Sequence, residues 1–235
     1  MNNKACDHSI EENGKVHQLC VSIVPIFNHL QPEEMVEVAK STRRLSLKKG
    51  ELLHSAGDIS DSLYIVHEGK IKVYRLAENG KEQLIRILKP GDFTGELALF
   101  SESIHDVYAE AMEGTEICSI QRKNLQNLLL KYPNISLKIL NEFSNRLNQA
   151  EHQMTSFATE EAETRIALYL LQLAEESGSS SVQLPMSRKD LASFLGTTPE
   201  TISRKLTKFE EEGWIQQKDQ RMIIILKMAA LRLIQ

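Results

Sequence analysis

The sequence predicts an α+β protein in which a small barrel or roll of short strands is followed by one long helix and then by a C-terminal helix-turn-helix with a wing. Three patterns predict this arrangement. Apolar and polar residues alternate with a period of two over residues 44–120. After Tyr132-Pro133 the apolar residues recur at steps of three and four. Near the C-terminus, two helical segments with good caps flank Gly196, and a hairpin pattern follows them.

The composition limits the classes of protein to which the chain can belong. Its 235 residues are enough for one large or two ordinary domains, each with its own core. A net charge of −4 argues against indiscriminate nucleic-acid binding, but residues 182–235 hold nine basic and six acidic side chains, so this end alone suits a phosphate backbone. The sequence shows neither an apolar run of about 18 residues nor the apolar core of a signal peptide. We therefore expect a cytoplasmic protein with no membrane partner.

The N-terminal quarter begins with a polar segment, residues 1–24, which we predict to be flexible. A helix is expected to begin at Gln31-Pro32. Pro fits the first helical turn, and Glu33 and Glu34 lie near the positive end of the helix dipole.

Residues 44–120 contain short alternating segments, such as residues 63–66 and 71–74, separated by turn residues. This pattern indicates many short strands, and strands at this spacing favour a small barrel or roll. Asn79-Gly80 lies between two such segments. We predict a hairpin there with a type I′ turn, which needs a positive φ at both central residues.

A long helix is predicted over residues 132–160 from an apolar seam formed by Leu140, Phe143, Leu147, Ala150, Met154 and Phe157. A seam that repeats every 3.5 residues is typical of a helix that packs along a partner helix. We therefore expect these six residues to form a dimer interface. The alternative is that they pack against the chain's own domain.

Two further helices precede the recognition segment. One is predicted over residues 160–176 and ends at Ser177-Gly178, where a serine-rich run indicates a loop or hinge. Ser187 is a good N-cap for the other, over residues 188–194, and Asp190 completes a pair that resembles a capping box.

The last helix of the pair begins after Gly196. Thr198 is a good N-cap, Pro199 fits the first helical position and Gly213 ends the helix. One face of this helix is apolar and can pack on apolar residues of the preceding helix. The two sets are Ile202, Leu206 and Phe209, and Leu191, Ala192 and Leu195.

The opposite face carries Glu200, Ser203, Arg204 and Thr207, which suit the edges of bases in a DNA major groove. Arg can bond guanine O6 and N7 together, Glu can accept a hydrogen bond from cytosine N4, and Ser can bond several bases. Two flanking lysines are placed to hold phosphates. The expected contacts with double-stranded DNA are Glu200, Ser203, Arg204, Thr198, Lys205, Lys208 and Ser187.

A hairpin is predicted after this helix from Trp214-Ile215, a polar turn at residues 218–220 and an apolar run over residues 222–226. Such a hairpin is the wing of a winged helix-turn-helix. The alternative is a plain pair of helices whose polar face is solvated. The two caps, the glycine turn, the wing and the local positive charge favour DNA binding.

Together these motifs resemble the Crp/Fnr family of transcription regulators over residues 25–226. The matching stretches are GELLHSAGD, LYIVHEGKIKVY, KPGDFTGELALF, EEAETRIALYLLQL and LASFLGTTPETISRKL. The resemblance implies an N-terminal cyclic-nucleotide-binding-type β-roll, a long dimerisation helix and a C-terminal winged helix-turn-helix. The implied domains are the flexible Cys- and His-containing segment 1–24, the sensor roll 25–131, the dimerisation helix 132–160 and the DNA-binding domain 161–235.

The ETISR stretch resembles the FNR-like branch of the family. In the cyclic-AMP branch an Arg precedes the Glu, whereas Pro199 occupies that position here. The resemblance implies TTGAT-like half-sites read by Glu200, Ser203 and Arg204, in an inverted repeat that requires a symmetric homodimer. RNA polymerase is a further implied partner.

The alternative from another class is a regulatory subunit of an enzyme or channel that uses the roll. The sequence contains no Gly-rich phosphate loop, nucleophile elbow or HExxH motif, so we expect no enzyme activity.

Cyclic AMP is not expected as the effector. Members that bind cyclic nucleotides follow GEL with an Arg and a Ser or Thr about ten residues later. Gly95, Glu96 and Leu97 are present, but the later positions hold Asp106 and Val107. A carboxylate there would repel a phosphate, so we interpret Glu96 as a remnant of the fold.

Three cysteines are the candidates for sensing oxygen or redox state. Cys118 resembles the cluster-ligating cysteine of the FNR roll, and Cys20 resembles the last of the N-terminal cysteines. A four-thiolate iron–sulfur cluster is one ligand short here, because only Cys6 remains upstream. The missing ligand could come from Asp7, His8 or His17. A resemblance to Gram-positive, Flp-type members implies instead a reversible disulfide between Cys118 and Cys20 or Cys6.

Zinc is a further alternative, because Cys6, His8, His17 and Cys20 form the pattern C-x-H-x8-H-x2-C with ligands that zinc prefers. That spacing matches no common zinc finger. Another alternative is a buried structural Cys118 with idle N-terminal thiols. The predicted regulator therefore responds to redox state, or to a non-redox ligand, or to no effector.

Overall fold

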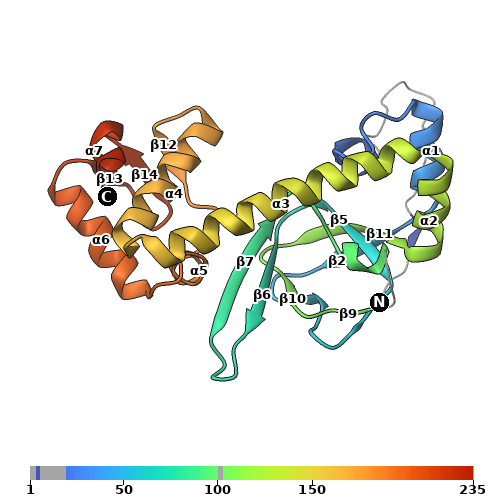
Figure 1. The fold of residues 1–235 in the computed structure, drawn as a ribbon, viewed down its shortest axis with the longest axis horizontal. Coiled ribbons are helices and arrows are strands. Elements are labelled where there is room, and N and C mark those ends of the chain that lie inside the picture. The colour runs from blue at the N-terminus through green and yellow to red at the C-terminus, as the bar shows by residue number, and fades with distance from the viewer. Residues whose placement is uncertain (1–3, 6–19, 100–102, 235) are drawn as a thin grey trace. The chain divides into compact units, whose positions relative to one another are not determined.

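The computed structural model describes residues 4–5, 20–99 and 103–234 and divides the chain into two compact units. The first comprises residues 1–79 and 85–145, and the second comprises residues 80–84 and 146–235. Figure 1 labels many of their helices and strands. Among the described helices, none is both long and apolar enough to cross a membrane.

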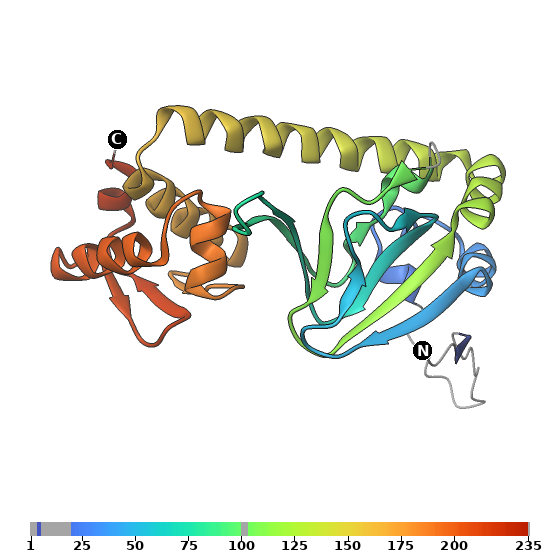
Figure 2. The same cartoon turned by 90° about the horizontal axis from the view of Figure 1, so that it is seen from below.

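The first unit is the predicted β-roll (Figure 2). Its larger sheet has the order β1 (Lys4–Ala5), β2 (Thr42–Leu47), β11 (Thr115–Gln121), β5 (Ser62–Glu68) and β8 (Phe93–Thr94). The second sheet has the order β3 (Leu52–His54), β10 (Tyr108–Ala111), β6 (Ile71–Leu76) and β7 (Glu82–Leu88). A short pair joins β4 (Ile59–Ser60) to β9 (Ser103–Ile104). The central strand β11 pairs antiparallel with β2 and β5, which places Cys118 opposite Arg44 and Ile65.

Two hydrophobic clusters fill the roll. One joins residues of both sheets, including Val66, Val73 and Ile117. The other packs the larger sheet against η1 (Cys20–Ile23), α1 (Pro32–Lys40), α2 (Arg122–Lys131) and the first turns of α3 (Pro133–Thr159). The short helix η2 (Glu96–Leu99) follows β8.

The end of the segment predicted to be flexible belongs to this core. Val24 is 0% exposed, because it joins the cluster beneath the larger sheet. Lys4–Ala5 pair with β2. These parts of residues 1–24 are therefore ordered elements of the roll, and residues 1–3 and 6–19 lie outside the described part of the chain.

The connection between β6 and β7 differs from the predicted type I′ turn. Five residues, 77–81, separate the two strands, and Gly80 has a φ of 76°. No described residue other than glycine has a positive φ, so Asn79 does not adopt the left-handed conformation that a type I′ turn requires. The longer loop removes that requirement, because one left-handed glycine is enough to reverse the chain.

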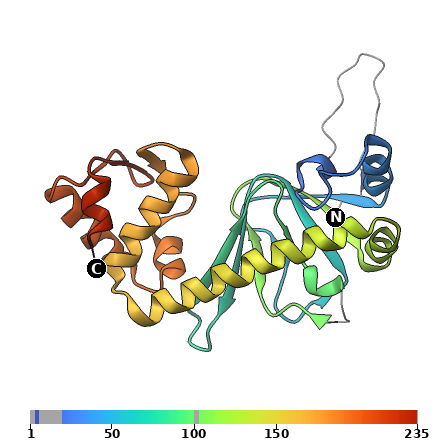
Figure 3. The same ribbon diagram turned by 45° about the horizontal axis from the view of Figure 1, so that its top comes forward.

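The predicted long helix is α3, one continuous helix of 27 residues (Figure 3). Ile135 and Ile139 near its start are buried on the roll. Farther along, Leu140, Leu147 and Met154 are 57%, 62% and 72% exposed. These three apolar side chains of the predicted seam are therefore more than half exposed.

The second unit is the predicted winged helix-turn-helix. It contains α4 (Ala162–Ser177), α5 (Arg188–Phe194), α6 (Pro199–Glu211) and α7 (Met228–Arg232). Its sheet has the order β12 (Ser181–Gln183), β14 (Met222–Ile225) and β13 (Ile215–Gln217), and the wing is the hairpin of β13 and β14. The serine-rich run predicted as a loop ends in β12, which pairs with β14 and buries Val182.

Candidate nucleic-acid interface

Capped helix ends fix the positions of α5 and α6, as the sequence predicts. Ser187 Oγ accepts a hydrogen bond from the backbone N–H of Asp190 at 3.2 Å and donates one to the Asp190 carboxylate at 2.6 Å. Thr198 Oγ1 accepts from the backbone N–H of Thr201 at 3.2 Å. Because each hydroxyl satisfies an otherwise unpaired helical N–H group, it defines where its helix begins.

The inner face of α6 belongs to the core of the second unit. Ile202, Leu206 and Phe209 are each 0% exposed. They lie at steps of four and three, so they share one side of the helix. Leu191 and Ala192 of α5 are also buried. This packing determines which side of α6 faces outward.

The outer face of α6 presents polar side chains along the first half of the helix. Glu200, Arg204 and Thr207 are exposed, and Ser203 is partly exposed. A carboxylate, a guanidinium group and two hydroxyls therefore lie on one accessible surface. Such a set can donate to and accept from base edges.

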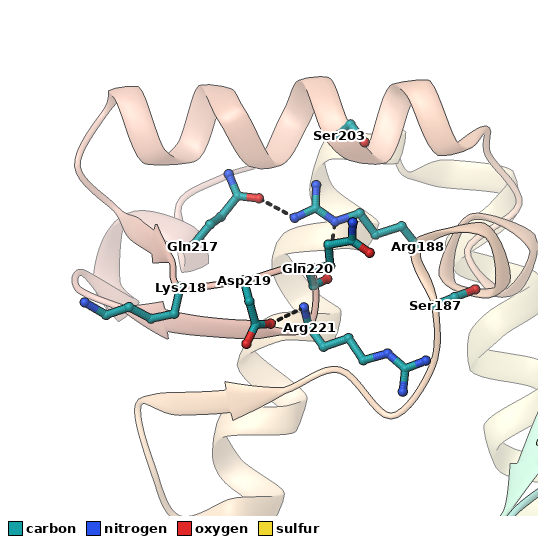
Figure 4. A pocket seen from close by; sticks show the side chains of 8 residues that line it. All are labelled: Ser187, Arg188, Ser203, Gln217, Lys218, Asp219, Gln220 and Arg221. Carbon is teal, nitrogen blue, oxygen red and sulfur yellow. Dashed lines mark hydrogen bonds between the residues drawn. The ribbon is translucent and has the colours of Figure 1, made fainter. Parts of the chain in front are cut away.

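An open cavity of about 600 Å³ lies between this helix and the wing (Figure 4). Ser203 faces it from α6, Arg188 enters it from the start of α5, and the turn between β13 and β14 lines its other side. Three of the lining side chains are cationic and one is anionic, which suits a polyanion. The lining residues are Ser187, Arg188, Ser203, Gln217, Lys218, Asp219, Gln220 and Arg221.

Hydrogen bonds across this cavity join the wing to both helices. Arg188 Nη2 donates to Gln217 Oε1 at 2.6 Å, and Arg188 Nε donates to the Gln220 carbonyl at 3.4 Å. Gln217 donates from its backbone N–H and from Nε2 to the Glu210 carboxylate, at 2.6 and 2.9 Å. The wing is thereby held at one position against α6.

The sequence did not predict that Arg188, Gln217 and Glu210 join the wing to the two helices, although one signal pointed to Arg188. Arg188 lies in the first turn of α5, where the helix dipole disfavours a cation. A cation at that position indicates a partner elsewhere in the structure.

Two of the predicted phosphate contacts are instead engaged within the unit. Lys205 and Lys208 both form ion pairs with Glu163 of α4; the Lys208 Nζ to Glu163 Oε1 distance is 2.8 Å. Burial alone would raise the pKa of Glu163, but the hydrogen bonds from both lysines outweigh it and lower that pKa. In this structure their ammonium groups face Glu163, and their contact with DNA phosphates stays a prediction. Each lysine comes directly before an inner-face residue, Leu206 or Phe209, so it lies at the edge of the outer face and can reach Glu163 of α4.

The predicted dimer residues divide into two groups. Leu140, Leu147, Ala150 and Met154 are exposed on α3. Phe143, by contrast, is partly buried against the core of the roll. For Phe143 the alternative reading, packing against the chain's own domain, therefore applies at least in part.

Phe157 supports the helix-turn-helix from the end of α3. Its ring lies 5.4 Å from the guanidinium carbon of Arg165, whose Nε donates to the Leu195 carbonyl at 2.9 Å. Gly196 in the turn has a φ of 64°, and a Cβ atom added there would lie 3.4 Å from the Phe157 ring. Phe157 is nevertheless 40% exposed, so part of its ring remains on the surface.

The sensing candidates are not assembled into a site by the described residues. Cys118 is 2% exposed in the core of the roll and is not in a disulfide. The backbone of Cys20 lies in η1. Cys6, His8 and His17, on which the predicted cluster and zinc sites depend, lie outside the described residues. Within the described part of the chain, no three His, Cys, Asp or Glu residues are grouped as metal ligands would be.

The region that would hold a cyclic phosphate carries carboxylates paired with arginines. Asp106 forms an ion pair with Arg75, and Arg86 Nη2 lies 3.1 Å from Glu96 Oε1. Both arginines are thus engaged, and a phosphate placed here would meet the Asp106 carboxylate. The residues present do not fit cyclic AMP.

A stacked pair of histidines lies next to this region. The rings of His54 and His105 are 3.6 Å apart at 9°, and the residues are 5% and 6% exposed. His54 Nδ1 donates to the Val107 carbonyl at 3.2 Å, whereas Nε2 of each ring has no hydrogen-bond partner among the described residues. Burial, together with the charge of His105, lowers the pKa of His54 from 6.5 to about 4, and burial also lowers the pKa of His105. Both rings are therefore neutral at pH 7.

The chain is similar to families and proteins already known. Residues 44–132 match the cyclic nucleotide-binding domain family, and residues 164–234 match the Crp-like helix-turn-helix domain family. The probable transcriptional regulator flp of Lacticaseibacillus casei is 36% identical over 206 residues, which cover 88% of this chain and 94% of that protein. The nitrogen fixation regulation protein FixK of Bradyrhizobium diazoefficiens is 32% identical over 213 residues, which cover 88% of each. The solved structure of FixK2 from Bradyrhizobium japonicum superimposes with a TM-score of 0.73 at 26% identity, covering 82% of this chain and 96% of that one.

Proposed function

Because this chain belongs to the Crp/Fnr family of transcription regulators, we propose that it binds, as a homodimer, inverted repeats of TTGAT-type half-sites. The chain is a DNA-binding regulator and not an enzyme, as its relatives are regulators. The observation that carries the proposal is the outward set of Glu200, Ser203 and Arg204 on α6, next to a cationic cavity at the wing. Once bound, the dimer acts on RNA polymerase.

Base and phosphate contacts are assigned to different residues. Glu200, Ser203 and Arg204 read base edges in the major groove. Lys218 and Arg221 of the wing contact the phosphate backbone. Ser187 and Thr198 lie at the N-terminal ends of α5 and α6, where backbone N–H groups favour phosphate.

The exposed seam of α3 supports the homodimer. Leu147 and Met154 are more than half exposed, and an apolar stripe of this length is disfavoured in water. A second copy of α3 would cover it along the 3.5-residue repeat. A two-fold axis through this pair would match the symmetry of an inverted repeat.

The DNA-binding proposal is tested by fluorescence anisotropy on a labelled duplex with two TTGAT half-sites in inverted repeat and on a scrambled duplex. Arg204→Ala is expected to weaken binding to the repeat by about 1–3 kcal/mol, which is roughly ten- to a hundredfold. Arg232→Ala is the matched control, because it removes the same charge from an exposed ion pair on α7. The proposal fails if the wild-type protein binds both duplexes equally, or if the two variants lose the same affinity.

A response to oxygen or thiol redox state through Cys6, Cys20 and Cys118 is proposed as the input. Cys118 is part of the core, so it reacts only after β11 opens locally. The test is the affinity of wild-type protein and of single Cys→Ser variants for the repeat, under oxidised and reduced conditions. Equal affinity of the wild type in both conditions rules out redox sensing and leaves another ligand, or none.

A further inference from the structure

The recognition helix α6 carries three cations on its first three turns, and they are not equivalent. Arg204 is exposed on the outer face. Lys205 and Lys208 converge instead on the two carboxylate oxygens of Glu163, one lysine to each oxygen. The Glu163 side chain is only 11% exposed, while those of Lys205 and Lys208 are 22% and 48% exposed.

We propose that Glu163 is a specificity-determining residue that holds Lys205 and Lys208 away from the phosphate backbone and thereby restrains binding to DNA of arbitrary sequence. This inference rests on the proposed DNA-binding function. Glu163 contacts no base in this role. It acts by occupying two ammonium groups that would otherwise add contacts independent of sequence.

The chemistry of the cluster supports this role. The two oxygens of the ionised Glu163 carboxylate each accept a hydrogen bond from one ammonium group. The two charged oxygens of a backbone phosphate could accept the same bonds, so Glu163 competes with phosphate for the lysines. The hydrogen bond with Glu163 also raises the pKa of Lys208. Both partners are therefore charged at neutral pH, and the ion pairs persist across the physiological range.

The position of the lysines on α6 makes the restraint relevant to DNA. At about 100° per residue, Lys208 lies only about 40° around the helix from Arg204, one turn farther along. Its side chain is half exposed and long enough to turn towards a groove wall once it is released from Glu163. Lys205 lies between that position and the buried face.

Release of the lysines would strengthen the complex with DNA of arbitrary sequence more than the complex with a specific site. On a specific site, the contacts of Glu200, Ser203 and Arg204 fix the register of the protein, so freed lysines gain only what that register allows. On other DNA, the protein can adopt whichever arrangement gives the most phosphate contacts. Each additional phosphate contact makes the slope of log K against log salt more negative by about 0.9.

The test measures the affinity of the full-length protein for a random-sequence duplex and for the inverted repeat, by anisotropy across a series of salt concentrations. Glu163→Gln keeps the size of the side chain and removes its charge. It is expected to bind the random duplex roughly fivefold or more tightly at low salt, with a slope more negative by about one to two. The ratio of specific to random affinity is expected to fall.

Glu161→Gln is the matched control. It removes the same charge two residues earlier, from an exposed glutamate at the N-cap of α4 that attracts Lys208 at longer range but forms no hydrogen bond with it. A change in net charge alone would affect both variants equally, whereas release of the lysines is confined to Glu163→Gln. Lys205→Met with Lys208→Met, added to Glu163→Gln, is expected to restore the wild-type slope.

The same double lysine variant with Glu163 intact provides an independent check, which holds even if Glu163→Gln folds poorly. In that background the slope is expected to stay at the wild-type value, because the lysines do not contact DNA. A slope less negative than that of the wild type would show that the lysines contact phosphates, and would overturn the inference. An unchanged slope in a folded Glu163→Gln protein would also overturn it. If the wild type binds neither duplex, the proposed function fails instead.

Discussion

Acidification from pH 7 to pH 5 is expected to destabilise the roll through the stacked pair of His54 and His105. The pKa of His54 is about 4 in the folded chain and about 6.5 in the unfolded chain. Below pH 6.5 the unfolded state therefore binds a proton that the folded state excludes. The free energy of unfolding is therefore highest above pH 6.5, where the His54 ring is neutral in both states. It decreases as the pH falls from 6.5 towards 4.

The size of the effect follows from the two pKa values. One pKa unit corresponds to about 1.4 kcal/mol, so the full difference corresponds to about 3 kcal/mol, of which about 2 kcal/mol is already lost at pH 5. Asp58 and Glu96 act in the opposite direction on His54, and Asp58, Asp106, Glu96 and Asp61 do so on His105. Burial lowers the pKa of each ring by more than these carboxylates raise it. The pKa of His105 is also lowered, so its contribution has the same sign.

The assay combines a nuclear magnetic resonance titration of the imidazole protons with urea unfolding between pH 7 and pH 5, a window above the ordinary range of carboxylates. His54→Gln is expected to flatten the loss of unfolding free energy with pH. His152→Gln, at an exposed position on α3, is the control and should retain the wild-type dependence. The reasoning is refuted if His54 titrates near pH 6.5, or if the wild-type free energy of unfolding is constant over this window.

Three further predictions concern the turn, the seam and the buried thiol. Gly196→Ala is expected to lower the free energy of unfolding by about 1–2 kcal/mol in a urea titration, because alanine is strained at a φ of 64°; an unchanged midpoint would contradict this. Leu147→Asp is expected to give monomers in sedimentation at concentrations where Asn148→Asp, an adjacent exposed change, leaves dimers. If the two variants sediment alike, α3 is not the interface. With the other two cysteines replaced by serine, Cys118 is expected to react with a thiol reagent only at the rate of local opening, and fast labelling of the native protein would contradict its burial.

The elements that the sequence predicted well are those specified by neighbouring residues. α6 begins after a cap at Thr198, continues with Pro199 and ends near Gly213, and all of these signals lie within the helix or next to it. Its buried face follows from the spacing of Ile202, Leu206 and Phe209. The signals for α3 are also local to the helix, so its predicted range of 132–160 differs by one residue at each end from the observed Pro133–Thr159.

The features that were missed depend on partners far away in the chain. β12 is too short to show a pattern of its own and exists because β14 offers it an edge. Glu163 pairs with lysines about forty residues later, and no periodicity links them. The turn at Asn79-Gly80 differs from the predicted type I′ turn because strand pairing leaves a five-residue loop there. The length of that loop, and not the Asn-Gly pair, determines its conformation.

The separation of α6 into a packed side and an outward side also bears on how such regulators diverge. Ile202, Leu206 and Phe209 hold the helix whichever residues occupy the outward positions, and exposed substitutions typically change stability by no more than about 0.5 kcal/mol. A duplicated gene could therefore acquire a new set of promoters by exchanging Glu200, Ser203 or Arg204 while its scaffold stays intact.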